Sequence, residues 1–456
     1  MRSKLFVLRL PVVMALAVAV SSCNGGIAGS TTPLPAAATS AELSPHANRK
    51  IKHIVILIQE NRSLNNLFYG FPGARTSGYG YDTNGNKITL QPVSLATKWD
   101  LGHDAADYFH DCNGTGSIPG TNCKMNGFMN EFIGCGGAGP RCPNANPPYS
   151  YVPQSETMPY FDMGKQYVLA DEMFASNIDG SFVAHQYLIA GWAEKSANYP
   201  QTSWGCPGGP GDKVSMIGPQ RQVPDGSEVV CWDTPTLGDE LDTAGASWAY
   251  YGVSWNGKPW LWIAYQAIKH IFNGPDWSKD ILLSPNQFFT DVKNGNLRSV
   301  TWLTPTWPNS DHASNGSKSG PAWVASVVNT VGQSQYWDST AIFVLWDDWG
   351  GWYDPQAPKY LDYDGLGIRI PMLIVSPYAK RGHVSHEHYE LGSVLKFVED
   401  TFGLPRLAES DKRAKSPAQD CFDFSQAPRK FKVIPSSHDV QFFLSQPTDN
   451  RIPDAE

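Results

Sequence analysis

The sequence has little charge and no long hydrophobic run outside its N-terminus. Charged residues make up 17% of its 456 residues, below the roughly 25% of ordinary soluble domains. The net charge is −8, whereas nucleic-acid-binding proteins usually carry an excess of positive charge, so no nucleic-acid partner is expected. After the N-terminal segment, no run reaches about 18 consecutive apolar residues, which excludes a polytopic membrane protein.

Several catalytic signatures are also absent. The sequence has no G-x-S-x-G elbow, no H-E-x-x-H pair, no P-loop and no Rossmann glycine fingerprint. Their absence argues against α/β-hydrolase esterases, zincin proteases, and enzymes that hold nucleotides on a glycine-rich loop. The 41% hydrophobic content is enough for a large core, and 42 Gly, 35 Pro and 16 Trp indicate long, ordered, aromatic-rich loops.

The N-terminus has the pattern of an export signal. A basic start precedes an apolar run over residues 10–20, which is too short to span a bilayer comfortably. The run ends at Cys23 in a Val-Ser-Ser-Cys sequence that resembles a bacterial lipoprotein box. We expect a lipidated Cys23 that contacts the membrane, with ordinary signal cleavage nearby as the alternative. The protein would then be periplasmic, attached to the cell surface, or secreted.

The expected organisation is a signal peptide, a flexible tether, one large domain and a C-terminal tail. Residues 24–50 are rich in Ala, Ser, Thr and Pro, a composition typical of tethers. No clean linker interrupts the rest of the chain, which favours one large domain over two. The predicted boundaries are 1–22, 23–50, 51–432 and 433–456.

The remaining cysteines fit an oxidising compartment. Neighbours in loop-rich stretches are expected to form disulfide bonds. The plausible pairs are Cys112–Cys123, Cys135–Cys142 and Cys206–Cys231, which leave Cys421 over. A zinc site is the rival interpretation, but the sequence has no C-x-x-C pair.

Branched apolar runs alternate with helical patterns. A continuous apolar run suits a strand that is buried on both faces, as in parallel sheets. This alternation predicts an α/β fold with a mainly parallel central sheet, helices on both faces and loop insertions at 75–160 and 196–235. The strand runs are 52–58, 299–303, 341–346 and 371–375, and the helical patterns are 322–331 and 391–402.

Carboxylates follow two of the predicted strands. Glu60 and Asn61 come after the run 52–58, and Asp347 and Asp348 come after the run 341–346. Ligands bind at the carboxyl ends of strands in open parallel sheets, and adjacent aspartates repel unless a cation or a shared proton relieves them. Oxygen ligands of this kind suit a divalent metal. The alternatives are a helix-start acid for Glu60 and a solvated turn for the aspartates.

Three further residues are candidates for chemistry. Ser181 follows a predicted tight turn and would open a helix over 182–191, where N–H groups and the helix dipole favour an anionic oxygen and a phosphate. A simple helix cap is the alternative. His103 and His312 each lie beside an aspartate and are candidates for general acid, metal ligand or phosphate contact, with a purely structural role as the alternative.

Taken together, these segments resemble the bacterial phosphoesterase family of phospholipases C and acid phosphatases. The resemblance covers about residues 51–430, and two motifs carry most of it, Glu60-Asn61-Arg62-Ser63 and Asp347-Asp348-Trp349-Gly350-Gly351. It implies an alkaline-phosphatase-like fold and a divalent metal of unknown identity on Glu60, Asn61, Asp347 and Asp348. It also implies a Ser181 nucleophile and active-site roles for His103 and His312.

The resemblance has departures. Family phospholipases usually have Asp-Glu-His-Gly-Gly where this chain has Asp347-Asp348-Trp349, and the Ser and paired Asp lean toward the acid phosphatases. Trp349 and Trp352 flank the acidic pair and either box a choline head group or pack under the glycines.

The expected function is therefore an exported metal-dependent phosphoesterase. It would cleave a small phosphoester or a phospholipid through a phosphoserine intermediate, as an acid phosphatase or a phospholipase C. The alternative is a catalytically silent surface lipoprotein that keeps the fold and only binds ligands or host surfaces.

Overall fold

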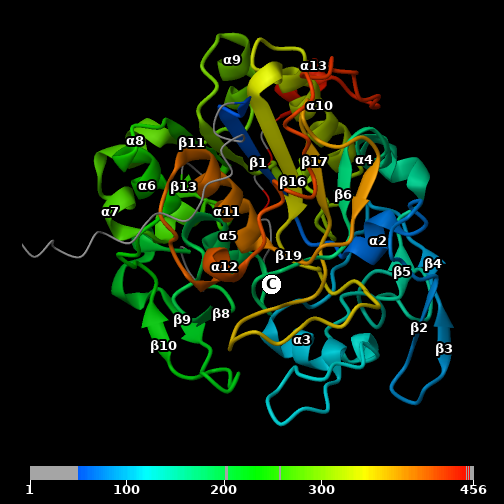
Figure 1. The fold of residues 1–456 in the computed structure, drawn as a ribbon. Helices are drawn as coiled ribbons and strands as arrows, with labels where there is room; N and C mark the ends of the chain where they lie inside the picture. The colour runs from blue at the N-terminus through cyan, green and yellow to red at the C-terminus, as the bar shows by residue number, and fades with distance from the viewer. Residues whose placement is uncertain (1–49, 201–203, 256–257, 448, 450, 452–456) are drawn as a thin grey trace, which may run out of the picture. The chain divides into compact units, whose positions relative to one another are not determined.

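The central sheet is built from the apolar runs expected to be strands. The computed structural model describes residues 50–200, 204–255, 258–447, 449 and 451, so Cys23 and the predicted signal lie outside the described residues. Among the described residues the largest sheet has eight strands (Figure 1). In sheet order these are β14 (Ile281–Leu282), β11 (Trp248–Tyr251), β15 (Val300–Leu303), β1 (His53–Gln59), β16 (Thr340–Trp346), β17 (Met372–Val375), β6 (Val168–Ala170) and β18 (His383–Ser385).

The sheet is mainly parallel, as the sequence predicted. The exception is β17, which is antiparallel to both of its neighbours, β16 and β6. Parallel neighbours need a crossover, which is usually a helix. The described connection from β16 to β17, residues 347–371, contains no α-helix, so the chain turns at the edge where β16 ends and returns in the opposite direction.

Helices cover both faces of the sheet, which confirms the predicted α/β class. Neighbouring positions of a strand point to opposite faces. On one face of the sheet, Phe343 of β16 contacts Phe397 of α11 (Leu391–Phe402), with ring centroids 5.0 Å apart. On the other face, Trp346 contacts Tyr160 of α4 (Gln154–Gln166) at 5.0 Å. The indole N–H of Trp302 in β15 donates to Leu188 of α5 (Ser181–Ala190).

The other elements are short, apart from α10 (Gly320–Gly332), which packs beside α4. Among the described residues, no helix is long and apolar enough to cross a membrane. The remaining helices are α2 (Leu64–Phe68), α3 (Ala105–Cys112), α6 (Leu237–Thr243), α7 (Lys269–Phe272), α8 (Pro275–Asp280), α9 (Gln287–Lys293), α12 (Glu409–Arg413) and α13 (Val440–Leu444).

Small sheets lie outside the central one. The paired strands are β2 (Tyr79–Tyr81) with β3 (Lys87–Thr89), β4 (Gln91–Pro92) with β5 (Ser150–Tyr151), β7 (Met173–Phe174) with β19 (Tyr389–Glu390), β8 (Ser196–Ala197) with β9 (Lys213–Met216) and β10 (Ser227–Val229), and β12 (Ser254–Trp255) with β13 (Lys258–Pro259). In the predicted C-terminal tail, α13 packs against α10 and Phe443 is buried.

The expected cysteine pairing is confirmed. The described part of the chain has disulfide bonds at Cys112–Cys123, Cys135–Cys142 and Cys206–Cys231, and among the described cysteines Cys421 alone is free and is buried. All three bonds lie in the loop insertions. The insertions also carry α3, which the sequence analysis did not predict.

We predict that the disulfides stabilise the protein in the order of the loops they close. The sequence separations are 25 for Cys206–Cys231 and 7 for Cys135–Cys142. The loss of chain entropy in the unfolded state then predicts a stabilisation of about 3.5 kcal/mol for Cys206–Cys231 and about 2.4 kcal/mol for Cys135–Cys142. Denaturant titration of the two Cys→Ser double variants should show the larger loss for Cys206 and Cys231. A larger loss for the shorter loop would contradict this entropic account.

Candidate active site

The pairing of β1 with β16 brings two acidic segments together. The two strands run parallel in register, ending with Gln59 opposite Trp346, so the residues after each strand meet. The backbone N–H of Asn61 donates to Oδ1 of Asp347 at 3.0 Å. Glu60, Asn61, Asp347 and Asp348 are all buried. The structure thus brings together the four residues predicted to hold a metal.

Local backbone geometry keeps the two segments in contact. Asn61 has a φ of 56°, a left-handed conformation that Asn tolerates better than most residues. Gly350 has a φ of 59°, and a Cβ there would lie 2.1 Å from the carbonyl oxygen of Asn61. Only glycine therefore fits at position 350 without moving the Asn61 segment, which explains a glycine directly after Asp348-Trp349.

Ser181 reaches the same cluster from α5. The N-cap of α5 is Gly180, and Ser181 is its first helical residue, so the hydroxyl does not serve as a simple helix cap. Its Oγ lies 3.4 Å from Glu60 Oε2, 3.4 Å from Asn61 Oδ1 and 3.3 Å from Asp348 Oδ2. One hydroxyl proton cannot serve three acceptors at once. The site therefore has an excess of oxygen acceptors around Ser181.

His185 belongs to the cluster, although the sequence analysis did not select it. It lies four residues after Ser181, on the same face of α5. Its Nε2 is 3.2 Å from Glu60 Oε1 and 3.6 Å from Asp347 Oδ2. The spacing of Ser181 and His185 on a predicted helix was the available signal.

The charges of His185 and Asp347 are linked. Burial favours the neutral imidazole, but Tyr250 and the hydrogen bond and charge of Asp347 outweigh it and raise the pKa of His185 to about 9. Burial likewise favours a protonated Asp347, but His185 outweighs it and lowers the pKa of that carboxyl to about 2. The site thus needs positive charge beside its carboxylates.

The cluster fits a divalent cation. One ligand atom from each of Glu60, His185 and Asp347 lies within 4.8 Å of the others. Asp347 Oδ2 is buried, and apart from the His185 ring at 3.6 Å it has no hydrogen-bond partner among the described residues. A buried carboxylate oxygen of this kind is normally paired or bound to a metal.

Both predicted histidines are also in the site. His103 Nε2 lies 2.6 Å from Asn61 Nδ2, and its Nδ1 lies 2.7 Å from the carbonyl of Leu101. His103 Nδ1 therefore donates to Leu101, while Nε2 accepts from the Asn61 amide, which turns Asn61 Oδ1 toward Ser181. The ring of His312 lies 5.8 Å from that of His103.

The loop that carries His312 is attached to the end of β1. The side-chain amide of Gln59 donates to the carbonyl of Asn309 and accepts from the N–H of Asp311. The guanidinium of Arg62 donates to the carbonyl of Asp311 at 2.7 Å. Residues on either side of Glu60-Asn61 thus fix His312 relative to the acidic cluster.

The two tryptophans after the acidic pair are packed inside. Trp349 donates its indole N–H to Asp111 at 2.8 Å. Trp352 lies against Arg62, with the guanidinium carbon 4.6 Å from its ring centroid. Both rings are fully buried. The structure therefore favours packing under the glycines over a choline box.

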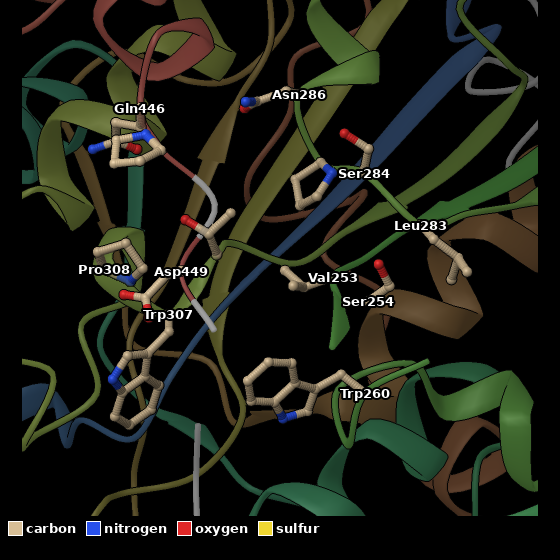
Figure 2. Close-up of a pocket in the computed structure, with 13 residues that line it drawn as sticks. Val253, Ser254, Trp260, Leu283, Ser284, Asn286, Trp307, Pro308, Gln446 and Asp449 are labelled. Carbon is tan, nitrogen blue, oxygen red and sulfur yellow. The ribbon is translucent and has the colours of Figure 1, made fainter. Parts of the chain in front are cut away.

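Figure 2 shows a pocket whose wall includes Trp307 and Pro308, which shortly precede His312 in the sequence. Its volume is about 210 Å³, and segments after β11, β14 and β15 line it. Trp307 forms part of its wall and also contacts His312, with ring centroids 4.7 Å apart. None of the described residues that line it is Lys, Arg or His, so the pocket offers no side-chain positive charge for a phosphate group.

The fold and the site now identify the class of protein. The chain belongs to the Phosphoesterase family, whose model matches residues 51–405. It is a hydrolase that acts on ester bonds. The resemblance read from the acidic motifs is thereby confirmed, while the individual roles of Ser181, His103, His312 and the predicted metal ligands remain predictions.

Curated relatives of the chain are phospholipases C. Phospholipase C B of Mycobacterium tuberculosis is 25% identical over 438 residues, covering 85% of this chain and 80% of the relative. Non-specific phospholipase C1 of Arabidopsis thaliana is 24% identical over 430 residues, covering 81% and 73%. Among solved structures, a protein in the alkaline phosphatase superfamily from Vibrio parahaemolyticus matches at a TM-score of 0.37 with 11% identity, covering 80% of this chain and 71% of that one.

We predict that hydrolysis depends on a divalent cation. Removing it with a strong chelator should abolish activity, because the carboxylates would then repel the phosphate, and adding a divalent cation should restore it. Asp347→Asn should remain inactive after metal is added back. Asp338→Asn, at the opposite end of β16 and exposed, is the matched control. Full activity in protein shown to be metal-free by elemental analysis would contradict the prediction.

Proposed function

We propose that this chain is an exported, metal-dependent phosphoesterase that hydrolyses phospholipids as a phospholipase C does, through a phosphoserine on Ser181. One observation carries the proposal. The Ser181 hydroxyl, at the start of α5, lies within 3.4 Å of oxygens of Glu60, Asn61 and Asp348. The phospholipase C relatives supply the substrate class.

The chain's own residues account for the chemistry. The Ser181 oxygen attacks phosphorus while its proton passes to a neighbouring carboxylate, Glu60 or Asp348. The bond from phosphorus to the leaving alcohol breaks, and His103 or His312, in its protonated form, gives a proton to that alcohol oxygen. Water then attacks the phosphoserine and gives a proton to the histidine, the bond from phosphorus to the seryl oxygen breaks, and the carboxylate returns its proton to Ser181. Two in-line steps give net retention at phosphorus. Glu60, Asn61, Asp347 and Asp348 would hold the metal, which when bound supplies positive charge that neutralises phosphate and lowers the pKa of the hydroxyl.

The second candidate is an acid phosphatase, which would cleave phosphomonoesters at the same site. The serine at position 181 and the aspartate at position 348 favour it. A panel of phosphatidylcholine and phosphomonoesters, assayed with and without chelator, separates the two. The silent-lipoprotein alternative is less favoured, because a protein that only binds has no need to keep Ser181 and the acidic residues together.

Ser181→Ala should lower kcat by about 10⁴-fold or more, the scale on which loss of a covalent nucleophile acts. Ser181→Thr should keep part of the activity, since the resembled family uses Thr or Ser there. Acid quench with labelled substrate should place the label on Ser181. Ser326→Ala, which also removes a buried hydroxyl but on α10, is the matched control. Label on another residue, or near-native turnover of the alanine variant, would overturn the assignment.

Export remains part of the proposal. Three disulfide bonds support an oxidising compartment. We expect the mature chain to begin at a lipidated Cys23 and to partition with membranes, and Cys23→Ser should release it. Mass spectrometry of the N-terminus is the measurement. An unmodified N-terminus at another residue would refute lipidation and leave export intact.

A further inference from the structure

His185 is placed to act directly on the metal site. It lies on α5 one turn after Ser181 and is 1% exposed. Its Nε2 faces the carboxylates of Glu60 and Asp347, at 3.2 and 3.6 Å. Neither the sequence motifs nor the family resemblance had assigned this residue a role.

Hydrogen bonds on the far side of the ring fix which nitrogen carries the proton. The Tyr250 hydroxyl donates its proton to the carbonyl of Trp262, so its oxygen is left to accept. His185 Nδ1 lies 3.2 Å from that oxygen and therefore carries the N–H that donates to it. In the neutral ring, Nε2 then presents a lone pair to two carboxylates, which is unfavourable unless a cation lies between them. Metal-bound histidines are usually oriented by a donor contact of this kind.

The spacing of the three side chains fits a shared ion. Nitrogen and oxygen ligands lie about 2.0–2.2 Å from zinc, so two ligands at a tetrahedral angle are about 3.4 Å apart. The distances from His185 Nε2 to Glu60 Oε1 and Asp347 Oδ2, 3.2 and 3.6 Å, lie on either side of that value.

We propose that His185 Nε2 is a direct ligand of the metal, together with Glu60 and Asp347. The inference rests on the metal-dependent function proposed above and adds a nitrogen ligand to the all-oxygen set that the family resemblance implies. Imidazole suits zinc, iron and similar transition metals, whereas magnesium and calcium prefer oxygen alone. The site therefore selects a transition metal or zinc over magnesium or calcium.

The test measures metal binding without hydrolysis. The metal-stripped full chain is titrated with Zn²⁺ and with Mg²⁺ by calorimetry, and its Mn²⁺ form is examined by electron spin echo spectroscopy for coupling to ¹⁴N. We expect ¹⁴N coupling in the native chain and tighter binding of Zn²⁺ than of Mg²⁺. His185→Gln should lose the coupling and weaken Zn²⁺ binding by more than the roughly 10–100-fold that loss of a second-shell partner costs.

Two further variants keep the result interpretable. His53→Gln changes a histidine at the opposite end of β1 and should bind metal like the native chain. Tyr250→Phe leaves the His185 ring in place but removes the acceptor of its N–H, so Zn²⁺ affinity should fall by about 10–100-fold. This variant also tests the inference should His185→Gln fail to fold.

Two results would overturn the inference. One is a native Mn²⁺ form without ¹⁴N coupling, and the other is coupling and Zn²⁺ affinity that survive in His185→Gln. The ring would then be an imidazolium paired with the carboxylates. Metal binding through His185 without cleavage of any phosphoester would uphold this inference while the proposed function fails, so the two failures are distinguishable.

Discussion

The parallel pairing of β1 with β16 is the constraint on which the candidate site depends. Seven residue pairs hold the two strands in register from His53 to Gln59, and the chain leaves both strands at the same edge. The residues that follow the two strands, Glu60-Asn61 and Asp347-Asp348, therefore lie close together, and all four are buried. Gathering carboxylates away from water is costly unless positive charge compensates them. That cost makes a structural role for the cluster a poor explanation and a cation site a good one.

The helix α5 adds two side chains to the carboxylates at the strand ends. Its first turn supplies the Ser181 hydroxyl and its second supplies His185, so one short element delivers both a nucleophile candidate and a nitrogen to the same carboxylates. The whole helix is buried, so the polar atoms of both side chains lie away from water. The geometry of Ser181 thus follows from the packing of α5 against α6 and α11 and not from a flexible loop.

Much of this was predictable from the sequence, for identifiable reasons. The strand ends carrying Glu60 and Asp347 followed from apolar runs, and the disulfides followed from neighbouring cysteines in glycine-rich loops. The direction of β17 was not predictable, since an apolar run reports burial and not orientation. His185 was missed because its spacing from Ser181 on a predicted helix does not reveal which side chains of other elements it faces. The Tyr250 hydroxyl that orients it lies 65 residues away in the sequence.

Trp349 stands at a position where this chain departs from the acidic motif of the resembled phospholipases. In the resembled phospholipases a histidine takes this place, so the motif alone suggests the loss of a site residue. In the structure the Trp349 indole N–H donates to Asp111, and the Trp349 ring centroid lies 6.4 Å from that of His103. The indole nitrogen is a donor only, so Trp349 adds no ligand atom to the cluster. The tryptophan at position 349 therefore does not count against the phospholipase C chemistry that we propose for Ser181.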